Sequence, residues 1–249
     1  MNFYKFSPAI LSPLVFLYAQ LVGALAIGIF SIKDISVISL IMMAVFVFAV
    51  LTCYLFLKII HIPTADDVSS IRWQPSMIAF SGGVLGALSM SILASNMELP
   101  DEVFQLQLAL SRNFLGLFNI IIVGPVAEEF VFREGIVGEM LRRGANPWTA
   151  IIVSAVMFGV MHLNFAQGLY ALPLGLLLGI IFYKTGGIVL TSILHILNNG
   201  FAAFQLRIMG EDVPDTPFTE LFGNAATAYT IMAVCGVLCV LLMRKLWNT

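Results

Sequence analysis

Seven long intervals of the sequence contain no Asp, Glu, Lys or Arg, and they limit what the chain can fold into. They cover residues 6–32, 35–57, 73–97, 113–127, 144–183, 185–206 and 221–243. A helix that crosses the hydrocarbon core of a bilayer needs about 20 consecutive apolar residues. The sequence therefore predicts an all-α fold, a polytopic integral membrane bundle of helices.

The composition supports the same class of protein. The 249 residues are 60% hydrophobic and only 10% charged, which is too apolar for a soluble globular domain. A net charge of −2 provides no basic surface for nucleic acid, so we expect no nucleic-acid partner. Cys53, Cys235 and Cys239 lie in apolar segments without disulfide or zinc spacing, and we interpret them as packing residues.

We expect about eight transmembrane helices in a single domain over residues 1–249. The interval 144–183 is long enough for two helices, divided by the polar and glycine-containing stretch 164–168. The interval 113–127 is short only because acidic residues end it, and the apolar pattern resumes through Val137. The expected helices cover about 8–31, 36–59, 75–95, 114–140, 148–162, 169–184, 188–207 and 225–243. We also expect an interfacial amphipathic helix over 98–112.

The distribution of lysine and arginine predicts the orientation. With eight crossings and both termini on one side, that side holds Lys5, Lys58, Arg72, Arg142, Arg143, Lys184, Arg244 and Lys245, and the other holds Lys33, Arg112 and Arg207. Cytoplasmic loops carry the excess of basic residues. We therefore expect an integral protein of a bacterial cell membrane, with both termini cytoplasmic and the loop 211–220 outside.

One expected membrane helix contains a cluster of charged residues. Glu128, Glu129, Arg133 and Glu134 follow Pro125, which we expect to bend the helix. Ionised side chains at bilayer depth are costly, and they usually face a protein interior or a water cavity and have a function. Glu129 and Arg133 share a helix face and suit an ion pair, whereas Glu128 lies about 100° round the axis. Glu128 is therefore our candidate for a free carboxylate that accepts and returns protons.

The same charges have a purely structural interpretation. Buried ion pairs also hold helices together without any catalysis. Two further helices, however, carry His162 and the pair His195 and Asn199. A lone histidine in an apolar helix is more often a hydrogen-bonded core residue, but two histidines beside a glutamate pair indicate a site. His195 and Asn199 are four residues apart and point the same way, so they can hold one ligand between them.

Three motifs together resemble a known family. Glu128-Glu129-x-x-x-Arg133, Phe158-x-x-x-His162 and His195-x-x-x-Asn199 resemble the motif set of the CAAX protease and bacteriocin-processing (CPBP, or Abi) family. The matched core covers about 115–205, and the resemblance implies an eight-span helical fold. Some members of the family are intramembrane endopeptidases and others are bacteriocin self-immunity proteins.

The resemblance implies roles for the matched residues. Glu128 would activate water for attack on a peptide bond of a peptide or membrane-protein substrate, and Glu129, Arg133 and Phe158 would support it. His162 would help to position the water or the glutamate, and His195 and Asn199 would stabilise the oxyanion.

Two alternatives to this interpretation remain. One is a non-enzymatic membrane immunity or scaffold protein that uses the same cluster to hold its bundle together. The other is a metal-dependent protease with zinc bound by Glu128, His162 and His195. No histidine begins an HExxH pattern, and Asn199 is a poor zinc ligand, so we expect no cofactor.

Overall fold

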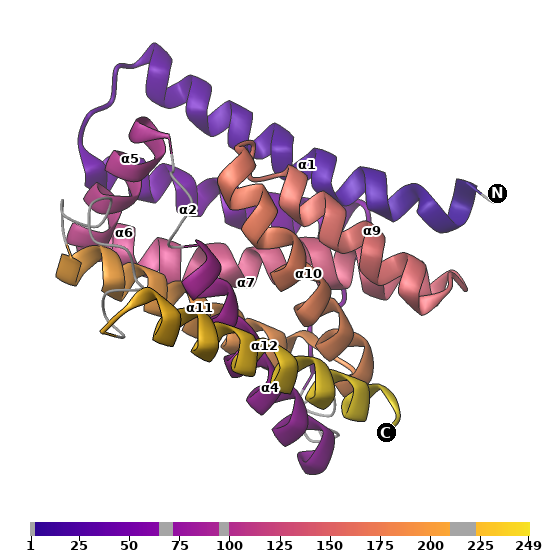
Figure 1. Cartoon of the computed structure of the whole chain (residues 1–249). Helices are drawn as coiled ribbons and strands as arrows, with labels where there is room; N and C mark the ends of the chain where they lie inside the picture. Colours follow the sequence, from indigo (N-terminus) through magenta and orange to yellow (C-terminus); the bar gives the residue numbers. More distant parts are fainter. Residues whose placement is uncertain (1–2, 65–71, 95–99, 210–222) are drawn as a thin grey trace.

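A computed structural model describes residues 3–64, 72–94, 100–209 and 223–249, and every regular element in these ranges is helical (Figure 1). The elements outside the fourth span are α1 (Phe3–Ile29), α2 (Ile35–Leu51) with its continuation η1 (Thr52–Phe56), α4 (Trp73–Ala94), α5 (Asp101–Arg112), α9 (Pro147–Val160), α10 (Phe165–Thr185), α11 (Ile188–Met209) and α12 (Ala225–Trp247). The fold is therefore the predicted all-α polytopic membrane bundle.

The fifth predicted helix forms close to its expected bounds but is shorter than a full membrane crossing. Within the described residues, seven helices are long and apolar enough to cross a membrane, and α9 falls below that length. Its 14 residues correspond to about 21 Å at the usual helical rise. Pro147 at the first helical position fixes its start, and the turn at Met161 and His162 follows its end. The interval 144–183 thus contains one short and one full-length helix.

Side-chain caps explain several of the helix boundaries. The Asn146 side chain accepts from the backbone N–H of Trp148, and the Asn164 side chain accepts from the N–H of Gln167, so each caps the helix that follows. Gly186 ends α10 with a φ of 83°, a left-handed conformation that glycine adopts at little cost. The α10–α11 turn falls where the sequence predicts it, whereas the α9–α10 turn falls at 161–164, ahead of the predicted stretch 164–168, most of which belongs to α10.

The fourth span, Phe114–Arg142, is one continuous helix with an irregular hydrogen-bond pattern. Its parts are α6 (Phe114–Phe118), η2 (Asn119–Val123), α7 (Gly124–Glu128), η3 (Glu129–Gly138) and α8 (Glu139–Arg142), and both η segments are π-helical. Stretches of π-helix are rare and occur frequently at functional sites. Pro125 lies in the short α-helical part between the two π-helical segments.

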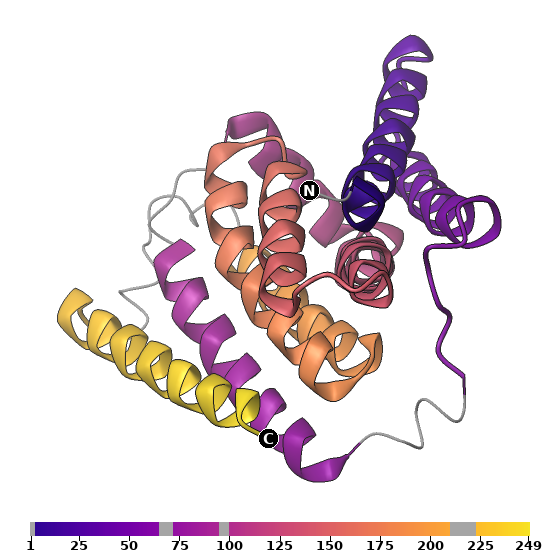
Figure 2. The same ribbon diagram turned by 90° about the vertical axis from the view of Figure 1, so that its right-hand side faces the viewer.

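The fourth span occupies the interior of the bundle. Figure 2 shows it between the α1–α2 hairpin on one side and α9, α10 and α11 on the other, and its segments contact all five of these helices. Farther from it, α4 packs along α12. The helix with the most charged residues is therefore surrounded by protein, as the cost of charges in lipid requires.

Glycine allows a close contact between α9 and α10 beside the site. A Cβ atom on Gly159 of α9 would lie 2.9 Å from the carbonyl oxygen of Gly168 on α10. Small residues of this kind let membrane helices approach each other. The close approach is one turn before His162, so it sets how the α9–α10 turn lies against the bundle.

Two predicted features concern residues near or outside the described ranges. The loop 211–220, which we expect on the outer side, lies outside the described residues. The amphipathic helix expected over 98–112 forms as α5 from Asp101 onward, and Glu98 lies outside the described ranges. In α5, Leu108 and Leu110 are buried, whereas Leu106 is exposed.

Candidate active site

Glu129 is the centre of a fully buried ion pair. Its Oε2 lies 3.2 Å from Nε of Arg133, and both side chains are 0% exposed. Neither Nη atom of Arg133 has a hydrogen-bond partner in the described residues. Glu129 is therefore the carboxylate that balances this buried guanidinium, and the structure contains the pair predicted from the four-residue spacing.

His195 lies between the two glutamates. Its Nδ1 is 2.9 Å from Oε1 of Glu129, and its Nε2 is 3.6 Å from Oε2 of Glu128. An ionised carboxylate only accepts hydrogen bonds, so the proton of this short contact sits on Nδ1. The second ring nitrogen then faces Glu128 at a distance too long for a direct hydrogen bond.

Glu128 differs from Glu129 in its surroundings. The Glu128 side chain is 18% exposed and has no short ion pair within the described residues, whereas Glu129 is completely enclosed. Their positions on successive faces of the helix produce this difference. Glu128 is thus the less constrained carboxylate of the pair, as predicted.

Phe158 on α9 connects the charged residues with both histidines. Its ring centroid lies 4.8 Å from Cζ of Arg133 in a cation–π contact. The His162 and His195 rings meet it edge to face, with centroids 5.0 and 5.7 Å away. A ring with four fixed neighbours, the fourth being Phe132 at 5.2 Å, has little rotational freedom. Phe158 therefore sets the spacing between the two histidines.

His162 lies in the turn after α9, whereas we expected it at the end of the fifth helix. From this turn the His162 ring meets Phe158, which also contacts the His195 ring, so both histidines lie against one aromatic ring. Nδ1 of His162 lies 2.8 Å from the Phe158 carbonyl oxygen, which can only accept a hydrogen bond. Nδ1 therefore carries the ring proton, and Nε2 of the neutral ring has none. The next residue, Leu163, has a φ of 56°, an unusual conformation of the kind found at functional sites.

Asn199 contacts the fourth span one turn beyond His195. Its Nδ2 donates to the Ile120 carbonyl at 3.0 Å. In a π-helix this carbonyl would accept from the residue five positions on, as Asn119 does from Gly124, but that residue is Pro125, which has no N–H. Asn199 thus supplies the donor that the proline removes.

Sequence reasoning missed two polar residues next to Asn199. Nδ2 of Asn198 donates to Oδ1 of Asn199 at 3.2 Å, and the Tyr170 hydroxyl donates to Oδ1 of Asn198 at 2.5 Å. Asn198 directly precedes the predicted site residue Asn199, and this adjacency in the sequence could have identified it as a site residue. Tyr170 lies on another helix, and no spacing in the sequence connects it with Asn199.

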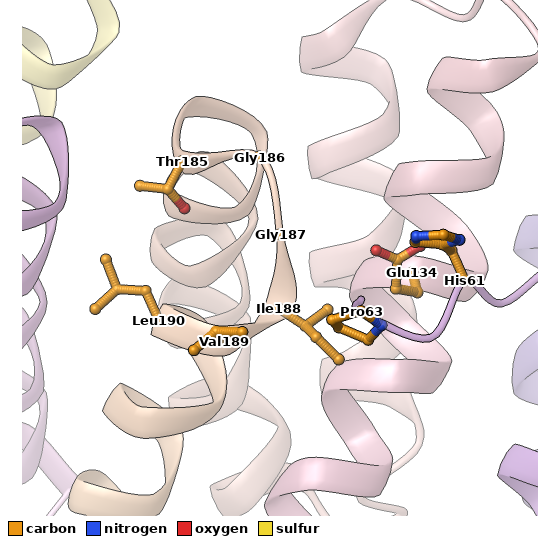
Figure 3. A pocket seen from close by; sticks show the side chains of 9 residues that line it. All are labelled: His61, Pro63, Glu134, Thr185, Gly186, Gly187, Ile188, Val189 and Leu190. Atoms are coloured by element: carbon orange, nitrogen blue, oxygen red, sulfur yellow. The ribbon is translucent and has the colours of Figure 1, made fainter. Parts of the chain in front are cut away.

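A second polar cluster lies at the other end of the fourth span. Arg142 pairs with Glu134 at 3.2 Å and with Glu139 at 2.7 Å, and it also donates to the Ile59 carbonyl at 2.9 Å. Figure 3 shows His61 beside Glu134, across from the α10–α11 turn. The cavity between them has about 30 Å³, room for about one water molecule. This cluster attaches the segment after η1 to the fourth span.

The residues proposed as zinc ligands do not converge on one point. Among the described residues, no group of three His, Cys, Asp or Glu side chains is placed to hold a metal ion. Both histidines donate from Nδ1, His195 to Glu129 and His162 to a carbonyl, and keep an unprotonated Nε2, as metal-binding histidines usually do. What does not fit a three-ligand metal site is the separation of Glu128, His162 and His195 in this arrangement.

Taken together, the fold and the site define a membrane-embedded helical bundle with a carboxylate, arginine and histidine cluster in its interior. Residues 110–201 match the family model described as Type II CAAX prenyl endopeptidase Rce1-like. This match confirms the resemblance to the CAAX protease family that the three motifs indicate. The matched residues 110–201 include every predicted site residue.

Two curated bacterial proteins are similar to the chain. One is the membrane-embedded CAAX protease MroQ of Staphylococcus aureus (strain USA300), 32% identical over 96 residues, which are 36% of this chain and 39% of that protein. The other is the putative membrane peptidase YdiL of Bacillus subtilis (strain 168), 24% identical over 139 residues, or 55% and 56% of the two chains. The chain thus aligns with less than two thirds of either relative. No solved structure matches.

Proposed function

We propose that this protein is an intramembrane endopeptidase that hydrolyses a peptide bond with water activated by Glu128. One observation carries the proposal: of two adjacent glutamates, Glu129 is enclosed with Arg133 and His195, while Glu128 stays partly exposed beside them. A structural ion pair needs only the first carboxylate. The second is left for proton transfer, and the family match supplies the reaction class.

In the proposed reaction, the Glu128 carboxylate accepts a proton from water while the water oxygen bonds to the carbonyl carbon of the peptide. The carbonyl electron pair moves onto oxygen and forms a tetrahedral oxyanion. Glu128 then gives the proton to the amide nitrogen as the C–N bond breaks. The carboxylate is regenerated, and the products are a carboxylic acid and an amine.

The surrounding residues supply the other requirements of amide hydrolysis. His162 has a ring nitrogen free of its proton and can accept a hydrogen bond from the attacking water. His195 and Asn199 are the proposed donors to the oxyanion, and His195 can donate from Nε2 only as an imidazolium, because its Nδ1 proton is held by Glu129. The second N–H of the Asn199 amide is available for this role, because only one is used by the Ile120 carbonyl.

We propose that the substrate is a peptide or a membrane protein. Glu128, His195 and Asn199 lie on helices that are long and apolar enough to cross the bilayer, so the scissile bond must reach them from the membrane or its surface. The relatives named a CAAX protease and a membrane peptidase are in line with such substrates.

Comparison of membrane peptides with and without a working Glu128 tests the proposal. Membranes that contain Glu128→Gln are expected to accumulate uncut proteins whose fragments appear with the wild type. Ser154→Ala, a buried change outside the reacting groups, serves as the matched variant and should give the wild-type pattern. Identical peptide patterns for wild type and Glu128→Gln, with both proteins folded, would support the immunity or scaffold alternative instead.

We further propose that the reaction needs no metal. The proposal rests on the separation of Glu128, His162 and His195, which in the described residues do not converge on one point, and on the amide at Asn199. Elemental analysis of purified active protein, with activity measured after chelation, tests it. Stoichiometric zinc whose removal abolishes activity and whose return restores it would overturn this part.

A further inference from the structure

We infer that Tyr170 and Asn198 are positioning residues that orient the Asn199 amide. The inference rests on the proposed function, because it concerns the donor to the proposed oxyanion. It starts from a continuous hydrogen-bond chain that links α10, α11 and the fourth span. The chain runs from the Tyr170 hydroxyl through the Asn198 and Asn199 amides to the Ile120 carbonyl.

The donor-to-acceptor direction of this hydrogen-bond chain is fixed at the Ile120 end. A backbone carbonyl can only accept, so the Asn199 group that faces it must be the NH₂ and not the oxygen. Pro125 removes the backbone donor that would otherwise compete for this carbonyl. The Asn199 oxygen is then turned toward Asn198, which must present its own NH₂ at 3.2 Å.

The same direction continues to the Tyr170 end, where the hydroxyl donates. With its NH₂ on Asn199, Asn198 presents its oxygen to the Tyr170 hydroxyl at 2.5 Å. The hydroxyl of Ser91 on α4 provides a second hydrogen-bonding group at this tyrosine. Both carboxamides are therefore locked in one orientation, because flipping either would oppose two donors or two acceptors.

The locked orientation matters for the proposed reaction. A carboxamide that rotates freely presents its oxygen to the substrate as often as its NH₂, and an oxygen would repel the developing oxyanion. Donors held in advance at the place where charge develops lower the barrier without reorganisation during the reaction. Tyr170 thus acts through Asn199, without touching the substrate.

The test uses Tyr170→Phe, which removes one hydroxyl and keeps the ring. Tyr183→Phe on the same helix is the matched control, because Tyr183 packs on Trp247 and takes no part in the hydrogen-bond chain from Tyr170 to Ile120. The substrate is the protein that accumulates uncut in Glu128→Gln membranes. Loss of one hydrogen bond predicts that kcat falls about 3- to 10-fold in Tyr170→Phe with KM unchanged. Tyr183→Phe should retain wild-type kcat.

The same change in an Asn199→Ala background separates positioning from general damage. Tyr170→Phe should have no further effect on kcat there, because its target is gone. A full effect in that background, or equal kcat values for Tyr170→Phe and Tyr183→Phe, would overturn the inference.

Thermal melting of the same purified variants tests the hydrogen-bond chain without any substrate. The stability losses of Tyr170→Phe and Asn199→Ala should be non-additive, and additive losses would overturn the inference. Non-additive losses in a protein that cleaves nothing would leave the hydrogen-bond chain standing and would contradict only the proposed function.

Discussion

At the scale of single residues, the site depends on how one buried cation is balanced. The spacing of Glu129 and Arg133 was enough to predict their ion pair from the sequence, because residues four apart share a helix face. The contacts of Phe158 with Arg133 and both histidines were not predictable, because they join helices that are distant in sequence. Local spacing identifies members of a site, but only the packing of helices shows which of them touch.

The ion pair predicts unequal effects of similar substitutions. Glu129→Gln and Arg133→Ala each leave one buried partner without its counterion, at a cost of about 3–5 kcal/mol in unfolding free energy. Glu128→Gln is the matched control, since it makes the same chemical change at the neighbouring, partly exposed residue. Melting temperatures in detergent measure the three variants. Equal and small losses for all three would contradict the pairing.

At the scale of the element, the fourth span is the least regular helix and carries the most chemistry. Its start was predictable from the charge-free pattern, which begins at Asn113. Its π-helical segments were not, because each adds a residue to a turn without changing which residues are apolar. The bounds of α9 were predicted to within two residues, but a helix of this length was counted as a full membrane crossing.

Pro125→Ala tests the role assigned to the irregular helix. Alanine restores a backbone N–H that can bond to the Ile120 carbonyl and compete there with Asn199. Asn199→Ala should then cost less stability in the Pro125→Ala background than in the wild type, by about 1 kcal/mol. Melting of the four proteins in this double-mutant cycle measures the difference. The same cost in both backgrounds would show that Asn199 does not replace the missing donor.

At the scale of the whole molecule, α1 begins and α12 finishes at the same end of the bundle (Figure 1). The shortness of α9 does not alter this parity, because α9 and α10 together return the chain to the side from which it came. The charge bias of the loops predicts that this side is the cytoplasm.

Cysteine labelling in intact cells tests the orientation. Ser31→Cys, in the turn between α1 and α2, should react with a membrane-impermeant maleimide, whereas Thr249→Cys should react only after permeabilisation. Both positions are exposed, and the native cysteines are buried, so the unmodified protein provides the background. Labelling of Thr249→Cys but not of Ser31→Cys in intact cells would reverse the topology.

The central claim is that Glu128 activates the water that hydrolyses the peptide bond. The most direct measurement compares cleavage of one purified membrane substrate by wild type and Glu128→Gln in the same lipid, with melting temperatures recorded for both. Loss of a general base predicts a rate about 10²- to 10⁴-fold lower with a nearly unchanged melting temperature. Cleavage by Glu128→Gln at the wild-type rate would contradict the claim.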